Sequence, residues 1–217
     1  MADKQIISRQ RVADHGEVLT GSREVSAMLD LVKDETARLE SRFLEPACGD
    51  GNFLSAILER KLQVAGSRFG RDQGEWERSS ITAVSSLYGV DIIQENALKC
   101  RSRLFGVCVQ AYSGLFKDKV NPEWYKTVTH LLERNIIWGD ALSLMTVGDS
   151  PKPITFSEWS FVNRNMIKRR DFTFHGLLDH ASIAETPLFS DLGDDVFIPK
   201  PEKEYPLQHF LKLSDAK

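Results

Sequence analysis

Acidic residues and glycines follow three strand-like segments of the chain, at spacings that could form a ligand site. The turn LEPACGDGNF carries Glu45, Gly49 and Gly51. Asp91 ends the segment YGVDI, and Asp140 lies in IIWGDAL. Neighbouring parallel strands share one carboxyl edge, where glycines let backbone N–H groups approach a ligand and a carboxylate can accept ribose hydroxyls. This pattern predicts a nucleoside site.

The charges beside the turn favour a nucleoside without phosphate. Dinucleotide-binding turns read G-x-G-x-x-G and hold pyrophosphate at a helix start. Here Glu45 and Asp50 flank Gly49, and both carboxylates would repel phosphate but attract an ammonium group. S-adenosylmethionine carries an ammonium group and no phosphate, so it is the cofactor that we expect.

Alternating strand and helix patterns position these residues. A strand over 42–44 leads through the turn into a helix, and a strand over 87–92 leads into a second helix. The predicted inner faces of the two helices consist of Leu54, Ile57, Leu58 and Leu62, and of Ile93, Ala97, Cys100, Leu104 and Cys108. This order predicts an α/β fold with a doubly wound, mainly parallel sheet.

Other segments have weaker patterns. The polar stretch ADHGEVLTGS predicts a loop before a helix with Val25, Met28, Leu29 and Val32 at helical spacing and Ser22 as its cap. Residues 66–80 contain three glycines, many charges and no apolar period, which predicts a surface insertion.

Composition limits the possible functions. The 217 residues are 41% hydrophobic and carry a formal charge of -3, which gives no overall attraction for nucleic acid. No apolar run approaches the roughly 20 residues of a membrane span, so we expect a soluble, cytoplasmic protein. Cys48, Cys100 and Cys108 lack C-x-x-C spacing and a histidine cluster, so we expect neither a disulfide nor a metal site.

Four segments together resemble a known family. HGEVLT (15–20), LEPACGDGNFL (44–54), YGVDIIQEN (88–96) and NIIWGDAL (135–142) are similar to the cofactor half of the N6-adenine DNA methyltransferases of restriction-modification systems. The resemblance covers about residues 11–145. It implies a class I, Rossmann-like methyltransferase fold that binds S-adenosylmethionine, with a cofactor domain over 1–150.

The resemblance also implies a role for each matching residue. Thr20 would close over the methionine carboxylate, although the family usually has Phe before it and Pro after it, where this chain has Leu19 and Gly21. Glu45, Ala47 and Gly49 would line the methionine arm, with Gly51 in the same turn.

The remaining matches would surround the nucleoside. Asp91 would hold the ribose, Asp140 would accept the adenine amino group, and Ile92 and Leu142 would contact the adenine. The pocket wall would include Asn52 and Phe53. Helix capping remains an alternative role for both aspartates, and core packing remains one for Phe53 and Ile92.

The catalytic tetrapeptide of this family, Asn/Asp-Pro-Pro-aromatic, has one near match, Asn121-Pro122-Glu123-Trp124. Apolar residues recur after Trp124 at helical spacing, so we expect a helix over 122–133 with Pro122 first and Asn121 as its cap. The only positional candidate in the tail is Asn165, in an NRNM segment that is more typical of a turn between two strands.

The tail therefore predicts a different role. We expect 151–217 to complete the sheet or to dock a partner, with KRR (168–170) in a solvated turn or on nucleic acid and 191–217 as a partly disordered arm. The chain would be one component of a DNA methyltransferase that needs a second methyltransferase or specificity chain, or self-association, to act on DNA. The alternative is a non-catalytic, cofactor-binding regulatory protein.

Overall fold

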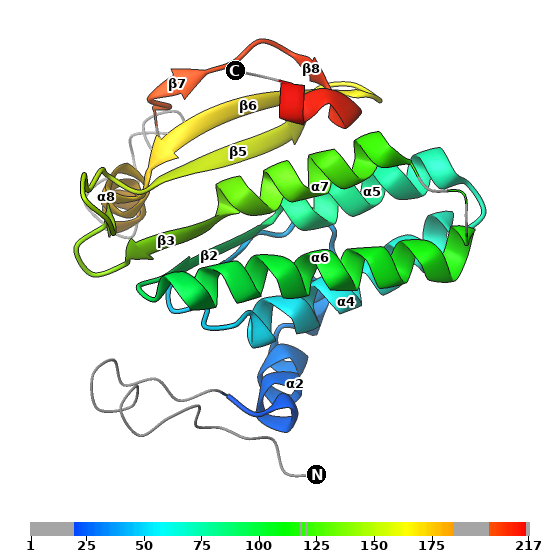
Figure 1. Cartoon of the computed structure of the whole chain (residues 1–217), viewed down its shortest axis with the longest axis horizontal. Helices are drawn as coiled ribbons and strands as arrows, with labels where there is room; N and C mark the ends of the chain where they lie inside the picture. The colour runs from blue at the N-terminus through cyan, green and yellow to red at the C-terminus, as the bar shows by residue number, and fades with distance from the viewer. Residues whose placement is uncertain (1–19, 118, 120, 185–199, 216–217) are drawn as a thin grey trace.

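The computed structural model describes residues 20–117, 119, 121–184 and 200–215. Its central sheet contains the parallel strands β1 (Phe43–Glu45), β2 (Leu87–Asp91) and β3 (Ile136–Asp140), followed by the short antiparallel β4 (Met145–Thr146). The strand order is β1-β2-β3-β4 (Figure 1). The predicted α/β class and mainly parallel sheet are confirmed. All three predicted strands are present at their predicted places.

Two long helices cover one face of this sheet. α4 (Asn52–Phe69) follows β1 and α6 (Gln94–Phe116) follows β2, and the two helices pack against each other and against β2. Both predicted inner faces are buried, apart from Ile93, which is partly exposed at the start of α6. The three parallel strands wind in one direction with α4 and α6 on the same face, so the described residues form only one half of a doubly wound arrangement.

Residues 66–80 form helices, so the predicted insertion is wrong. α4 continues to Phe69, and α5 (Gln73–Ser85) begins after Asp72, whose side chain accepts a hydrogen bond from the Glu75 N–H. The sequence pattern missed α5 because half of its buried residues are polar. Ser80 accepts a 2.9 Å hydrogen bond from the Trp124 indole N–H, and its hydroxyl donates to the Glu77 carbonyl. Small polar residues are buried here because each finds a partner.

The segment NPEW begins a helix, as predicted. α7 (Pro122–Asn135) has Pro122 at its first position, and the Asn121 side chain accepts a hydrogen bond from the Glu123 N–H at 3.1 Å. Trp124 is fully buried. The tetrapeptide-like sequence is therefore explained by helix capping and core packing.

Two short helices precede β1: α2 (Ser22–Leu31) and α3 (Lys33–Thr36). Of the four predicted apolar positions in α2 and after it, Val25 and Leu29 are buried, whereas Met28 and Val32 are exposed. Gly21 occupies the cap position, so the predicted cap at Ser22 is wrong by one residue. The predicted loop before α2 lies outside the described residues up to position 19.

A second, antiparallel sheet covers the other face of the central sheet. It contains β5 (Thr155–Phe161), β6 (Met166–Thr173), β7 (Lys203–Glu204) and β8 (Gln208–His209), and α8 (Phe174–Ala184) follows β6. A buried cluster joins the sheets and consists of Tyr88, Val90, Ile154, Phe156 and Phe174. The tail thus forms its own layer (Figure 1), in which Phe156 and Phe174 pack on the parallel sheet of the same chain and Trp159 packs on α7.

The basic run of the tail lies in β6, so the predicted solvated turn is wrong. Arg169 is 6% exposed and bonds Asp171 at 2.6 Å, Lys168 bonds Glu204, and Arg170 bonds Glu158. Each basic side chain therefore has an acidic partner within the chain. The predicted arm is also wrong over 200–215, where Phe210 and Leu213 are buried in the 3-10 helix η3 (Phe210–Asp215). Residues 191–199 of that arm lie outside the described residues.

Within the described part of the chain, no helix is long and apolar enough to cross a membrane.

Candidate functional site

Three carboxylates lie at one edge of the central sheet. Glu45, Asp91 and Asp140 are the last residues of β1, β2 and β3. These strands are parallel neighbours, and the arrowheads of β2 and β3 point to the same end of the molecule (Figure 1). The predicted meeting of the three strand ends is therefore present.

The turn after β1 is bonded directly to the end of β2. The Cys48 N–H donates to the Val90 carbonyl at 2.9 Å, and the Gly49 N–H donates to Asp91 Oδ2 at 2.8 Å. Gly49 and Gly51 have φ angles of 53° and 85°, in the left-handed region that favours glycine. A Cβ on Gly51 would lie 2.8 Å from the Cys100 sulfur, so α4 can pack on α6 only with glycine there.

Asp91 links three segments and is only 7% exposed. Its Oδ1 accepts from the Ile93 N–H at 2.8 Å and from the Asn96 side chain at 3.4 Å, next to the start of α6. The N-cap of α6 is Ile93, and the helix has no side-chain cap hydrogen bond, so the helix-cap alternative for Asp91 is wrong. A carboxylate offers about four acceptor positions, so Oδ2 retains a second lone pair beyond its bond from Gly49.

Asp140 is more open than Asp91. Its Oδ1 accepts from the Leu142 N–H at 2.9 Å, and this bond, with Ser143, holds the pKa of the carboxyl below its usual value. The group is therefore an ionised acceptor at neutral pH. Asp140 also orients the turn after β3, but no helix begins there, so the helix-cap alternative for Asp140 is wrong.

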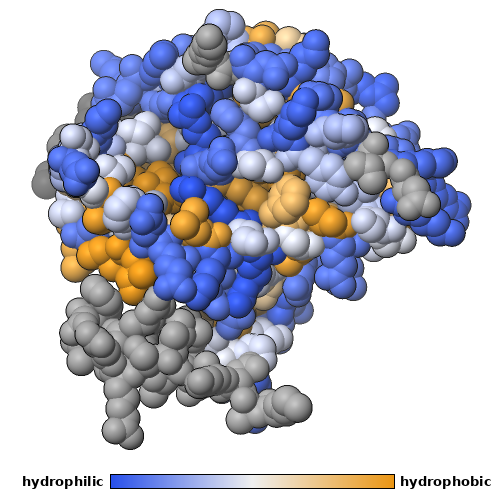
Figure 2. Space-filling view, viewed as in Figure 1, coloured by the Kyte–Doolittle hydropathy of each residue, from blue (hydrophilic) through white to orange (hydrophobic). Residues whose placement is uncertain are grey.

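Apolar side chains are exposed beside these carboxylates. Leu142 is 96% exposed and Ile92 is 47% exposed, so the core alternative for Ile92 is wrong. Phe53, by contrast, is partly buried against the main core. Apolar surface gathers at the end of the molecule toward which β3 points (Figure 2). Exposed apolar groups next to fixed acceptors are typical of a site for a planar heterocycle.

Trp138 belongs to this edge and was missed in the sequence. It pairs with Asp91 in the register of β2 and β3, and its indole N–H donates to the Ile92 carbonyl at 3.0 Å. The indole therefore fixes the backbone that carries Ile92. The signal was present in IIWGDAL, where a tryptophan two residues before an acidic strand end is placed close to the ligand edge.

Arg103 is a second residue that the sequence did not reveal. Its guanidinium bonds Asp50 Oδ2 at 2.6 Å and Asn52 Oδ1 at 3.1 Å, and the Asn52 amide donates to the Thr20 carbonyl at 2.5 Å. The positive charge of Arg103 offsets the negative charge of Asp50. The predicted repulsion of phosphate therefore depends on Glu45. No local pattern joins positions that are 51 and 53 residues apart.

Glu45 and its neighbours complete the turn. Burial raises the pKa of the Glu45 carboxyl, and a hydrogen bond from the Ala47 N–H opposes this shift. Ala47 is exposed. A hydrogen bond with Cys100 and burial raise the pKa of the Cys48 thiol, which agrees with a packing role for this cysteine rather than a nucleophilic one.

Asn165 is not brought to this edge. It lies in the turn between β5 and β6, where the Asn163 side chain accepts from the N–H groups of Asn165 and Met166. The adjacent Arg164 bonds Glu75, near the start of α5. Because the other end of α5 leads into the start of β2, this turn lies at the end of the molecule opposite the carboxylates (Figure 1).

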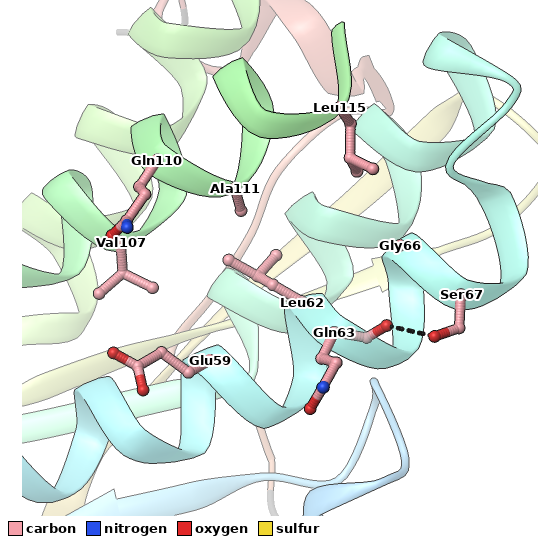
Figure 3. Close-up of a pocket in the computed structure, with 9 residues that line it drawn as sticks. All are labelled: Glu59, Leu62, Gln63, Gly66, Ser67, Val107, Gln110, Ala111 and Leu115. Carbon is pink, nitrogen blue, oxygen red and sulfur yellow. Dashed lines mark hydrogen bonds between the residues drawn. The ribbon is translucent and has the colours of Figure 1, made fainter.

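A separate groove lies between α4 and α6. It has a volume of about 580 Å³. Figure 3 shows side chains from both helices lining it, including Leu62 and Gln63 from α4 and Val107 and Leu115 from α6. Glu59 is its single ionisable residue, and no glycine turn opens into it. The groove thus lacks the strand-end carboxylates and the glycine turn of the carboxylate edge.

Neither a family model, nor a curated protein, nor a solved structure matches this chain. Among the described residues, no group of three or more His, Cys, Asp and Glu side chains could hold a metal ion. The chemistry of the edge is therefore inferred from its own residues.

Proposed function

We propose that the carboxylate edge binds S-adenosylmethionine and that the chain is a cytoplasmic, Rossmann-like component of an N6-adenine DNA methyltransferase of a restriction-modification system. One observation carries the proposal: the Gly49 N–H donates to Asp91 Oδ2 at 2.8 Å. This bond joins the glycine turn after β1 to the acid that ends β2, so the turn and a ribose acceptor are held side by side before a ligand arrives.

The other residues of the edge would share the recognition of the cofactor. Asp91 accepts a ribose hydroxyl, Asp140 accepts the adenine amino group, and the exposed Ile92 and Leu142 lie against the ring. Glu45 would face the ammonium end of the methionine arm. The turn and the pocket wall around this arm would be formed by Thr20, Ala47, Gly49, Gly51, Asn52 and Phe53. The cofactor supplies a methyl group activated by its sulfonium.

The acceptor base would come from elsewhere. The 217 residues contain no Asn/Asp-Pro-Pro-aromatic tetrapeptide, and Asn165 lies at the opposite end of the molecule from the edge. The basic residues 168–170 are paired with acids, and the net charge is -3. A second chain would therefore hold the DNA and present the adenine. A non-catalytic regulatory protein with the same pocket is the alternative, and it would bind the cofactor equally well.

Equilibrium dialysis with tritiated S-adenosylmethionine tests the cofactor. We expect saturable binding that adenosine displaces and that ATP displaces poorly, because Glu45 disfavours phosphate. Absence of binding at millimolar cofactor would refute the proposal. Equal displacement by ATP and adenosine would show that the site accepts phosphate and that the cofactor class is wrong.

A methyl-transfer assay separates the enzymatic version from the regulatory one. The chain alone should transfer no label to mixed genomic DNA. A partner that carries the tetrapeptide should restore transfer in the enzymatic version. If cofactor binds but no such partner restores transfer, the regulatory version holds.

A further inference from the structure

β1 has an open outer edge. It is the first strand in the order β1-β2-β3-β4, and no strand among the described residues pairs with its other side. The Phe43 N–H donates to the Ser86 carbonyl at 2.9 Å, toward β2. Because alternate residues of a strand bond to opposite sides, the N–H and C=O of Leu44 face outward. The edge thus offers one donor and one acceptor to a further strand.

An apolar cavity lies beside this edge. It has a volume of about 300 Å³. The apolar side chains that line it come from both sheets and α8: Phe43, Leu44, Tyr88, Phe156, Phe172 and Leu177. Leu44 is 43% exposed there. A strand added to β1 would place every second side chain over the face that carries this cavity.

The rim of the cavity has an excess of positive charge. Glu158 bonds both Arg42 and Arg170, so two guanidinium groups surround one carboxylate. Arg42 is 57% exposed as a side chain. A carboxylate on the incoming segment would meet Arg42 with favourable charge.

We propose that the outer edge of β1 is an acceptor for an extended segment of a different protein chain, which pairs with Leu44, fills the cavity with an apolar side chain and places an acidic residue at Arg42. A second copy of this chain is disfavoured, because pairing two β1 edges about Leu44 brings two positive rims together. The proposal is independent of cofactor binding. Addition of a strand to an exposed edge is a common mode of peptide recognition.

Selection from a displayed library of random linear dodecapeptides tests this proposal on the full chain. The key variant is Leu44→Pro, which removes the outward N–H; proline is tolerated on an edge strand where that N–H faces away from the sheet. Leu44→Val is the matched control, because valine keeps the N–H, favours strands and leaves an apolar side chain at the cavity. Melting curves of both variants show whether the fold is kept.

We expect enriched peptides that alternate apolar residues and contain an acid. Their consensus peptide should bind the wild type and Leu44→Val alike and bind Leu44→Pro about tenfold more weakly, as expected for a lost hydrogen bond and blocked pairing. Leu177→Trp fills the cavity without altering β1 and should weaken binding to a similar degree. This variant tests the proposal by itself if Leu44→Pro unfolds.

Two results would overturn the proposal. One is that no enriched peptide distinguishes the wild type from Leu177→Trp and from a folded Leu44→Pro. The other is that the wild type forms a dimer by light scattering and that Leu44→Pro makes it monomeric, which would show that a second copy occupies the edge. Dialysis with labelled cofactor is unaffected by either outcome.

Discussion

Two regions of the molecule hold carboxylates in opposite ways. In the helical layer, Glu77 is 3% exposed and accepts hydrogen bonds from Tyr112 at 2.6 Å, Asn121 at 2.8 Å and Gln73 at 3.1 Å. At the strand edge, backbone N–H groups orient Asp91 and Asp140, and apolar side chains beside them are exposed. A carboxylate surrounded by side-chain donors holds the fold, whereas one oriented mainly by backbone N–H groups at the end of a strand, beside exposed apolar side chains, is prepared for a ligand.

The largest effect should come from Glu77. Glu77→Leu removes the shared acceptor of the Tyr112 hydroxyl and the Asn121 and Gln73 amides, although Tyr112 and Gln73 keep their bonds to the Lys119 carbonyl. We expect a loss of about 3–5 kcal/mol in the free energy of unfolding, measured by urea denaturation. Glu77→Gln keeps one carbonyl oxygen and should lose less. If the variants bind cofactor as the wild type does, the two regions are independent; a folded Glu77→Leu that no longer binds would break the comparison.

The next effect concerns glycines. Gly51→Ala places a Cβ at a φ of 85° and 2.8 Å from the Cys100 sulfur. We expect a loss of about 1–3 kcal/mol in stability and weaker cofactor binding, because the turn must move. Gly66→Ala is the matched control inside α4, where the new Cβ would meet Leu115 at an ordinary 3.6 Å. It should gain up to about 1 kcal/mol, and an equal loss in both variants would show that the turn is not specially constrained.

A titration inside the helical layer should have a smaller effect. Burial, with the positive charges of Arg134 and Arg169, lowers the pKa of His130 to about 4, and its Nε2 is buried without a hydrogen-bond partner. The unfolded chain binds this proton near pH 6.5, so stability is lost as the pH falls from about 6.5 toward 4. His130→Phe should remove about 1–2 kcal/mol of the difference between urea unfolding at pH 7 and at pH 5. An unchanged difference would show that His130 titrates normally.

The sequence predicted what local patterns control. The strand ends, the glycine turn and the cap of α7 depend on residues within a few positions of one another, and all were found. α5 was missed because half of its buried residues are serines and Glu77, and the partners of Ser80 and Glu77 lie on other helices. The contacts of Trp138 and Arg103 were missed for the same reason. These contacts join residues that are far apart in the sequence, and the pattern of polar and apolar residues within one segment does not reveal them.

The tail shows the same limit. Its two strands and their NRN turn were predicted, but they form a second sheet over Tyr88 and Val90 instead of lengthening the parallel sheet. The position of the second sheet depends on which face of β2 the helices leave uncovered. All five residues of β2 are buried, so the second sheet covers that face. A strand buried on both faces reads as a continuous apolar run, which does not show what covers each face.

The most direct measurement is calorimetric titration of S-adenosylmethionine into wild type, Asp140→Ala and Asp149→Ala. Asp140 caps only its own turn, so its loss should leave stability within about 0.5 kcal/mol and weaken cofactor binding by about 1–3 kcal/mol, the value of a hydrogen bond to a charged group. Asp149 is exposed in the loop after β4, is not among the proposed cofactor contacts and provides the same charge change. Equal affinities for all three proteins, or no heat with the wild type, would contradict a nucleoside site at the strand ends.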